Sequence, residues 1–388
     1  MSKKYCIFIT ALFCAFIGVF LVANAVSPDR AFSEMENRNL QQMPAVDFGT
    51  PEKHFKDGNF FNGKFMRDFE TYTTDQFVGR DFWVGLKSTT ERALGKKENN
   101  GVYFGAQDTL ITRFDQPDAQ RVTDNLNYVN KFVENVDIPV VFSLIPTQAC
   151  IWADRLPEGA PNASQTDLLS QAQSTVTGST WADVYTPLWE HKDESIFYRT
   201  DHHWTSLGAY YGYVGLSSAL GYTPVSLSSY TETVRSTEFY GTVFSSSGVR
   251  WVKPDTISTY VPDDGITVVS HTYDNNGNPV EEQRSLYDTS YLSVKDKYSM
   301  FLGGNQSLAV VTNTNNPTGP KLLIIRDSYA DSLVPFLTAH YSEIHLIDPR
   351  YYHLSVSDYV KQNDIDQALV LYSVPNFTSD QNLFWITR

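Results

Sequence analysis

Two short stretches of the sequence hold residue types that can carry out acid–base and nucleophilic chemistry. Residues 200–205, TDHHWT, place a carboxylate, two imidazoles and an indole side by side in a chain with only eight histidines. Residues 327–329, DSY, directly follow an apolar run. A serine nucleophile needs a base within hydrogen-bond reach, and that base needs a carboxylate to orient it. Together the two stretches contain all three groups.

Ser328 is the candidate nucleophile. Residues 321–337 are predicted to form a strand, a tight polar turn and an apolar helix, with Ser328 at the turn. Hydrolases of the α/β class place their nucleophile at such a turn, because its backbone amide then faces the space above the sheet. The dipole of the following helix would stabilise an oxyanion there. The alternative is that Ser328 is an ordinary helix N-cap.

His203 is the candidate base and Asp201 its orienting acid. Two positions apart in an extended turn, their side chains lie on the same side of the chain. By the same alternation His202 is predicted to point the opposite way and to pack or cap. A helix is expected directly after the motif, at 206–221.

Two other interpretations of residues 200–205 remain open at this point. Aspartate and histidine suit zinc or iron, and further histidines stand at 340, 345 and 353. However, adjacent histidines on extended backbone diverge, and the sequence has no HExxH or CxxC motif. We therefore predict no metal. The motif could also be a surface turn.

Three further side chains are candidates for substrate contact. Trp204 could stack on a sugar ring, although core packing is the commoner role of a large ring. Tyr329 neighbours the candidate nucleophile. Arg350, with Tyr351, follows a predicted strand at 343–348, where ligands of α/β proteins bind, and could contact substrate or a carboxylate.

The elements around these motifs predict a parallel α/β sheet. Apolar residues at helical spacing over 122–136 precede a continuous apolar run at 138–146, the helix-then-strand unit of such sheets. Further buried strands are expected at 343–348 and 368–372. Residues from about 221 to 319 are rich in Thr, Ser, Tyr, Asn and Gly and predict an antiparallel insertion or subdomain.

The N-terminus predicts export. Lys3 and Lys4 precede an uncharged run from Tyr5 to Val26, which is long enough to cross a bilayer as a helix with its N-terminus in the cytoplasm. Residues 23–25, ANA, also resemble a signal-peptidase site, so a cleaved signal peptide is the alternative to the favoured anchor. From about Phe55 to Leu94 the spacing predicts two short helices.

Composition excludes some classes of function. The 388 residues carry a net charge of −14 without a basic run after the N-terminus, so nucleic acid is an unsuitable partner. Aromatic residues at 14% on an acidic chain fit neutral polar ligands such as sugars. Cys6 and Cys14 lie in the apolar segment, which leaves Cys150 alone outside it. Cys150 is expected to be a small buried residue, with a thiol nucleophile as the alternative.

The two motifs together resemble the bacterial DHHW protein family and the SGNH-hydrolase-like domain of alginate O-acetyltransferases. The resemblance extends to five further segments of the chain: SEMENRNLQQMP, DQFVGRDFWVGLK, NNGVYFG, LIPTQACIWADRLP and MFLGGNQS. It therefore touches most of the chain from Ser33 onward.

The resemblance implies roles for single residues. Ser328 would be the nucleophile, His203 the base and Asp201 its orienter, in the order that alginate-type domains show. The oxyanion would be held by the Ser328 amide with Gly304 and Asn305, unless those two form only a glycine turn. The sequence has Arg-Asp-Ser where typical SGNH enzymes have Gly-Asp-Ser, which affects how closely backbone can approach at the turn.

The expected organisation is a signal anchor or signal peptide at 1–26, a membrane-proximal helical segment at 27–100 and an SGNH-hydrolase-like domain at 101–388, with the β-rich insertion at about 221–319. The expected function is an extracytoplasmic O-acetyltransferase or acetylesterase on a cell-surface or secreted polysaccharide, held at the membrane or secreted. The resemblance implies a multi-spanning membrane acyltransferase as partner and no cofactor. The alternative is a non-catalytic polysaccharide-binding or assembly protein on a degenerate hydrolase scaffold.

Overall fold

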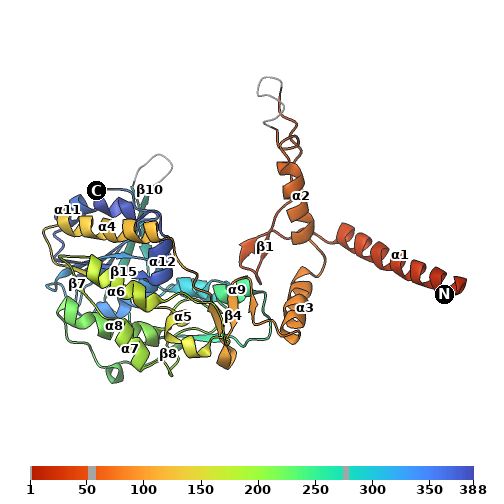
Figure 1. Ribbon diagram of the computed structural model, residues 1–388. Helices are drawn as coiled ribbons and strands as arrows, with labels where there is room; N and C mark the ends of the chain where they lie inside the picture. Colours follow the sequence, from red (N-terminus) through yellow and green to blue (C-terminus); the bar gives the residue numbers. More distant parts are fainter. Residues whose placement is uncertain (1, 51–57, 274–278) are drawn as a thin grey trace. The chain divides into compact units, whose positions relative to one another are not determined.

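The computed structural model describes residues 2–50, 58–273 and 279–388. The chain divides into two compact units, whose helices and strands are labelled in Figure 1. The first unit runs to Lys96 and includes Gly248–Arg250; the second consists of Lys97–Ser247 and Trp251–Arg388.

The first unit is built from helices and one small hairpin. Among the helices that the structure describes, one is long and apolar enough to cross a membrane, and it has no buried residue. The two short helices predicted before Leu94 are confirmed, while the part of that prediction around Phe55 lies outside the described residues. The elements are α1 (Lys3–Val26), β1 (Phe32–Ser33), β2 (Arg38–Asn39), α2 (Lys64–Asp75) and α3 (Arg80–Ala93).

The second unit is organised around an eight-stranded sheet in the order β11-β10-β12-β14-β13-β15-β6-β7. Its strands from β14 to β7 are parallel to one another, and those from β14 to β11 are antiparallel. The strands are β6 (Val140–Ile145), β7 (Thr180–Trp181), β10 (Ile266–Tyr273), β11 (Pro279–Arg284), β12 (Leu308–Asn313), β13 (Lys321–Arg326), β14 (Glu343–Ile347) and β15 (Gln367–Ser373).

The apolar runs in the sequence form the centre of this sheet. Every residue of β6 is buried, as is every residue of β13 after Lys321, because both strands have neighbours on each side and helices over each face. The strands predicted at 138–146, 343–348 and 368–372 are confirmed as β6, β14 and β15.

Helices cover both faces of the sheet. Figure 1 shows α4 and α11 along one side and α8 along the other. The helix predicted over 122–136 is confirmed as α4, whose first turn is capped by Asp118. The second unit's helices are α4 (Ala119–Asn135), α5 (Gln148–Ile151), α6 (Gln165–Thr175), α7 (Tyr185–Glu190), α8 (Ser206–Leu220), α9 (Thr242–Ser247), α10 (Val334–Leu337), α11 (Val356–Gln362) and α12 (Val374–Ser379).

The β-rich region at about 221–319 contributes to two sheets. Its strands β10, β11 and β12 form the antiparallel edge of the main sheet, while β8 (Thr233–Phe239) and β9 (Asp255–Thr259) pair separately. A further three-stranded sheet consists of β3 (Glu98–Asn99), β4 (Val102–Phe104) and β5 (Leu110–Thr112). The main sheet therefore extends into the region expected to be an insertion.

Candidate active site

The candidate site lies where the parallel strands end. Strand β13 ends at Arg326, directly before Asp327 and Ser328, and β6 and β15 on the same sheet end at Ile145 and Ser373. Because the carboxyl ends of parallel strands meet at one edge of a sheet, the loops that follow them converge there.

Three predicted residues meet at this edge in a hydrogen-bonded chain. His203 Nε2 lies 2.8 Å from Ser328 Oγ, and His203 Nδ1 lies 2.6 Å from Asp201 Oδ1. The positions come from stretches 125 residues apart in the sequence. In this arrangement one ring nitrogen can donate to the carboxylate while the other accepts the serine proton, which is the geometry of a nucleophile, a base and an orienting acid.

Asp201 is held on both oxygens. Besides the ring of His203, Oδ1 accepts from the His203 backbone N–H at 3.0 Å, and Oδ2 accepts from the Thr242 N–H at 2.8 Å and its hydroxyl at 2.9 Å. Burial opposes ionisation, but the charges of His202 and His203 and these hydrogen bonds outweigh it and lower the pKa of Asp201 well below its usual value. Close packing requires Gly241, where an added Cβ would lie 2.2 Å from Asp201 Cβ.

The ring of His203 packs against two other rings. Tyr298 stacks almost parallel to it at a centroid distance of 3.7 Å, and His202 contacts it at 3.9 Å. The Tyr298 hydroxyl also donates to the Ser328 carbonyl at 3.0 Å. Burial raises the pKa of Tyr298 well above its usual value, so this ring remains neutral. His203 and Ser328 therefore share one positioning side chain.

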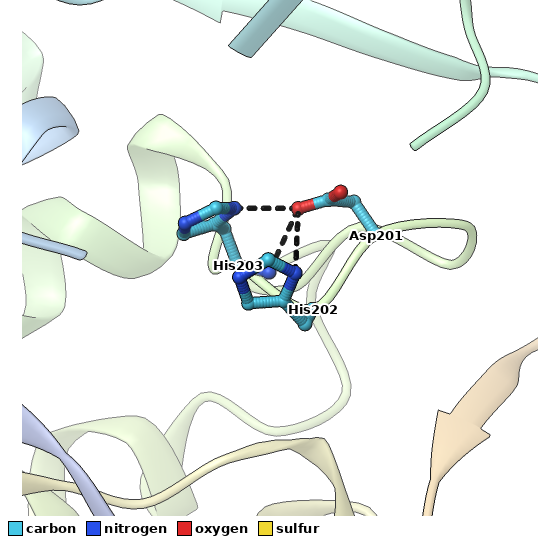
Figure 2. Close-up of side chains that lie close together, drawn as sticks. All are labelled: Asp201, His202 and His203. Atoms are coloured by element: carbon cyan, nitrogen blue, oxygen red, sulfur yellow. Dashed lines mark hydrogen bonds and ion pairs between the residues drawn. The ribbon is translucent and has the colours of Figure 1, made fainter. Parts of the chain in front are cut away.

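The prediction that His202 points away from Asp201 is wrong. Figure 2 shows both imidazoles turned toward the same carboxylate, with His202 Nδ1 3.8 Å from Asp201 Oδ1. His202 Nδ1 also shares a hydrogen bond with the Thr242 hydroxyl at 2.7 Å. The cause is a bend in the backbone through 199–203, which removes the strict alternation of an extended strand. Packing and the adjacent His203 lower the pKa of His202.

The helix expected after Ser328 is shorter than predicted. Ser328–Ser332 form a 3-10 helix, and α10 adds a single α-helical turn. A dipole needs several aligned peptide units, so the predicted contribution of a long apolar helix to oxyanion binding is not available here.

Known proteins resemble this chain in sequence and in structure. The sequence profile described as DHHW protein matches residues 145–347, which is more than half of the chain. The chain belongs to the DHHW protein family. A DHHW family protein from Eubacterium siraeum has a similar structure, with a TM-score of 0.63 at 27% identity over 74% of this chain and 95% of the other.

Two named relatives are also similar to this DHHW protein. The probable alginate O-acetylase AlgJ of Pseudomonas syringae pv. tomato is 28% identical over 158 residues, 38% of this chain and 40% of the relative. The chain thus matches about two-fifths of the length of such relatives. Bacillus cereus PatB1, solved with a sulfonyl adduct, shares the fold at a TM-score of 0.60 and 18% identity, covering 72% of this chain and 96% of the other. The second unit has the expected α/β fold, with a largely parallel sheet flanked by helices.

In this DHHW protein, Asp327 fixes the turn that carries Ser328. Its Oδ1 accepts from the Tyr329 N–H at 3.0 Å, and its Oδ2 accepts from the Ser373 N–H, the Ser373 hydroxyl and Asn376 Nδ2 at 2.7–2.9 Å. The carboxylate therefore joins the end of β13 to the end of β15 and to helix α12.

Arg326, where SGNH enzymes have glycine, is fully buried beneath the turn. It pairs with Asp331 at 2.9 Å and donates to Asn305 Oδ1 at 3.0 Å. Burial raises the pKa of Asp331 to about 7 in spite of the neighbouring guanidinium. The Gly304 N–H donates to the Phe301 carbonyl at 3.3 Å, and the backbone of Gly304 has a positive φ of 84°. The Gly304 amide is thus engaged in a turn, and the side-chain oxygen of Asn305 accepts from Arg326.

The two candidate aromatic residues both belong to the core. Trp204 is fully buried, and its indole N–H donates to the Tyr329 carbonyl at 2.9 Å, so core packing and not sugar stacking is its role. The Tyr329 side chain is buried as well, and its hydroxyl donates to the His202 carbonyl. These contacts connect the DHHW motif to the serine turn in addition to the bond between His203 and Ser328.

Two cavities adjoin the serine turn. One of about 360 Å³ is lined by His202, Tyr329, Thr147 and Asn376. The other, of about 350 Å³, is polar and includes Arg350 together with Asp327 and Asn376. Arg350 binds the buried Asp348 through two nitrogens, at 2.6 and 2.9 Å, so its guanidinium is held at the rim of that cavity.

Metal binding and thiol chemistry fit the site less well than serine chemistry. The ligand atoms of Asp201, His202 and His203 lie within 4.8 Å of one another, as a metal would require. However, each already has a hydrogen-bond partner, including Ser328 and Thr242. Burial raises the pKa of the Cys150 thiol to about 11, which disfavours the reactive thiolate.

Sequence reasoning missed several residues of the site. Tyr298 is one of 23 tyrosines and lies two positions before the segment MFLGGNQS. Thr242 and Asn376 stand in stretches without a recognised motif. Thr242 begins α9 and Asn376 lies in α12, and their residue types gave no signal because their contacts with Asp201 and Asp327 form only in the folded chain.

Proposed function

We propose that this DHHW protein is an SGNH-like O-acyltransferase or esterase in which Ser328 is the nucleophile, His203 the general base and Asp201 its orienting acid. The observation that carries the proposal is the 2.8 Å contact between His203 Nε2 and Ser328 Oγ, with Asp201 2.6 Å from the other ring nitrogen. A surface turn or a plain helix cap gives no reason for this chain of three groups.

The reaction would proceed in two balanced steps. In the first, Ser328 Oγ attacks the carbonyl carbon of an acyl donor, His203 Nε2 takes the serine proton, and the donor's leaving group departs with that proton. In the second, His203 removes a proton from an incoming hydroxyl, whose oxygen attacks the acyl carbon; the bond from that carbon to Ser328 Oγ breaks, and His203 returns the proton to Ser328 Oγ. A sugar hydroxyl in the second step makes the protein a transferase, and water makes it an esterase.

The cavity beside His202 and Tyr329 supports a bound acyl group or acceptor next to the nucleophile. It has about 360 Å³, which falls in the size range of small-molecule sites. An acetyl group on a polysaccharide is the proposed cargo, because relatives named probable alginate O-acetylase match 38% and 39% of this chain. The donor would come from a multi-spanning membrane acyltransferase.

Export is part of the proposal. The helix α1 is a candidate signal anchor, with a cleaved signal peptide as the alternative. We propose 1–26 as that segment, 27–100 as a membrane-proximal helical segment and 101–388 as the catalytic domain, exposed outside the cytoplasm. Acidic net charge and a sugar-sized site are both compatible with an extracytoplasmic polysaccharide.

The test is covalent labelling of the full-length protein in detergent. Intact mass would be measured after exposure to p-nitrophenyl acetate and, separately, to a sulfonyl fluoride. We expect one adduct in the wild type and none in Ser328→Ala. Ser332→Ala is the matched control, because Ser332 lies on the same turn and bonds Tyr298 but not His203. Equal labelling of wild type and Ser328→Ala would exclude Ser328 as the nucleophile.

A further inference from the structure

The start of helix α3 exposes a group of large apolar side chains. Phe82 is 64% exposed, Leu86 44% and Trp83 38%, and Phe77 in the loop before the helix is 38% exposed. Phe82 and Leu86 are one helical turn apart, so they and Trp83 share one face. We call these four residues the α3 aromatic face. Such a cluster on a surface marks a partner or a membrane.

The C-terminal end of α1 is fastened to this face. The ring of Phe20 stacks on Phe77 at a centroid distance of 5.7 Å and contacts Trp83 at 5.8 Å. The side chain of Asn24 accepts the Val78 N–H at 2.8 Å. All of these residues belong to the first unit. The position of α1 in a bilayer therefore fixes the depth of the α3 aromatic face.

The length of α1 sets that depth. Its 24 residues span about 36 Å, slightly more than the roughly 30 Å of a hydrocarbon core. Phe20 lies six residues before the end at Val26, which is about 9 Å along the helix axis. Rings that contact Phe20 cannot then lie in bulk water. They lie where hydrocarbon meets head groups, the zone that tryptophan prefers in membrane proteins.

The cavity between α1, α2 and the α3 aromatic face is largely apolar, as expected at a membrane interface. It measures about 740 Å³ and is lined by Phe16, Phe20, Tyr72, Phe77 and Trp83, with Asn24 among the few polar side chains. In a membrane, acyl chains can fill this apolar space from the side. In water it would leave a large apolar surface exposed at considerable cost.

We propose that the α3 aromatic face is a membrane-docking surface, inserted into the outer-leaflet interface beside α1. The partner is a lipid surface. The inference rests on the proposed function only in its assumption that α1 is retained as an anchor. The anchor then has two parts: α1 spans the bilayer, and α3 lies at the membrane interface. The membrane-proximal segment is thereby placed on the bilayer surface.

The experiment uses the full-length protein in vesicles of phosphatidylethanolamine and phosphatidylglycerol, with and without dibrominated acyl chains, which quench tryptophan on contact. Intact mass first confirms that α1 is present. Wild type, Trp83→Phe and Trp189→Phe are compared. Trp189 is the matched control, because it is 42% exposed but belongs to the second unit. The chain has seven tryptophans, so we expect brominated lipid to remove up to about one-seventh of the emission.

Trp83→Phe should abolish that loss and Trp189→Phe should preserve it. Adding Phe82→Trp to Trp83→Phe should restore quenching, because Phe82 is on the same face. Equal quenching of wild type and Trp83→Phe, or no quenching in the restored variant, would overturn the proposal and favour a protein partner or a second copy. Ser328→Ala should quench like the wild type, which separates this result from any failure of the proposed chemistry.

Discussion

Asparagine in place of Asp201 gives the sharpest test of the proposed orienting role. Each carboxylate oxygen accepts one backbone N–H, from His203 on Oδ1 and from Thr242 on Oδ2. The amide of asparagine has one acceptor and one donor end, so in either orientation its NH₂ opposes a backbone N–H. With the NH₂ toward His203, the ring nitrogen Nδ1 must accept and the proton moves to Nε2, where it blocks the serine.

The expected loss of acylation rate follows from the negative charge that Asp201→Asn removes. Unit charges 2.6 Å apart attract by about 6 kcal/mol at an effective dielectric constant of about 20, which bounds the help that Asp201 gives a protonated His203. Each 1.36 kcal/mol is about tenfold in rate, so the bound is about 10⁴-fold. We expect Asp201→Asn to slow acylation of Ser328 by about 10³- to 10⁴-fold, in line with serine triads.

The assay is the burst of p-nitrophenol release, followed by stopped flow and calibrated by the intact mass of the acyl-enzyme. Asp75→Asn is the control, because Asp75 is also buried but pairs with Arg38 in the first unit and contacts no imidazole in the described part of the chain. Its acylation rate should stay within about tenfold of the wild type. An Asp201→Asn rate equally close to the wild type would refute the orienting role.

The remaining predictions concern stability, the paired histidines and metal dependence. Because the folded pKa of Asp201 is depressed, its carboxylate stabilises the protein above the unfolded pKa of about 4, and this contribution is lost as pH falls through the folded pKa. In urea unfolding, the gap between wild type and Asp201→Asn should be constant from about pH 5 to 7 and shrink toward pH 3; an unchanged gap at pH 3 would contradict this. His203→Ala should lower the acylation rate at least about 10³-fold. His202→Ala should lower it less than about tenfold and cost about 1 kcal/mol of unfolding free energy. Equal losses of rate would count against His203 as the base. Asp331→Ala leaves the buried Arg326 guanidinium without its counter-ion and should cost about 3–5 kcal/mol in urea unfolding, and a cost below about 1 kcal/mol would show that the pair is not buried as described. Treatment with EDTA should leave acylation unchanged, and loss of activity that zinc restores would make the histidine cluster a metal site.

The central strands could be predicted because their burial leaves a direct trace in the sequence. Strand β13, its neighbours β14 and β15, and β6 beside β15 are rich in apolar residues and almost entirely buried, as strands covered on both faces require. The long helix α4 could likewise be predicted from the spacing of its apolar residues. The family and the fold class followed from two motifs that are specific in combination.

Local geometry within the site could not be predicted in the same way. The bend that brings His202 beside His203 depends on bonds from Thr200 to the distant Asp255 and from Gln148 to carbonyls of the same loop. Alternation rules assume extended backbone and carry no information about such contacts. Likewise, the short helix after Ser328 reflects tertiary packing, which overrides the helix propensity of an apolar run.

The position of β15 in the sheet determines when the site can form during synthesis of the chain. β15 lies between β13 and β6, and Ser373 at its end bonds Asp327. A growing chain that has not yet produced β15 lacks the strand that joins the serine turn to the loop after β6. Pairings this distant in sequence close late in folding, after local helices have formed. The candidate site is thus assembled only after β15 has been synthesised, so chains that stop before β15 would carry both motifs without a formed site.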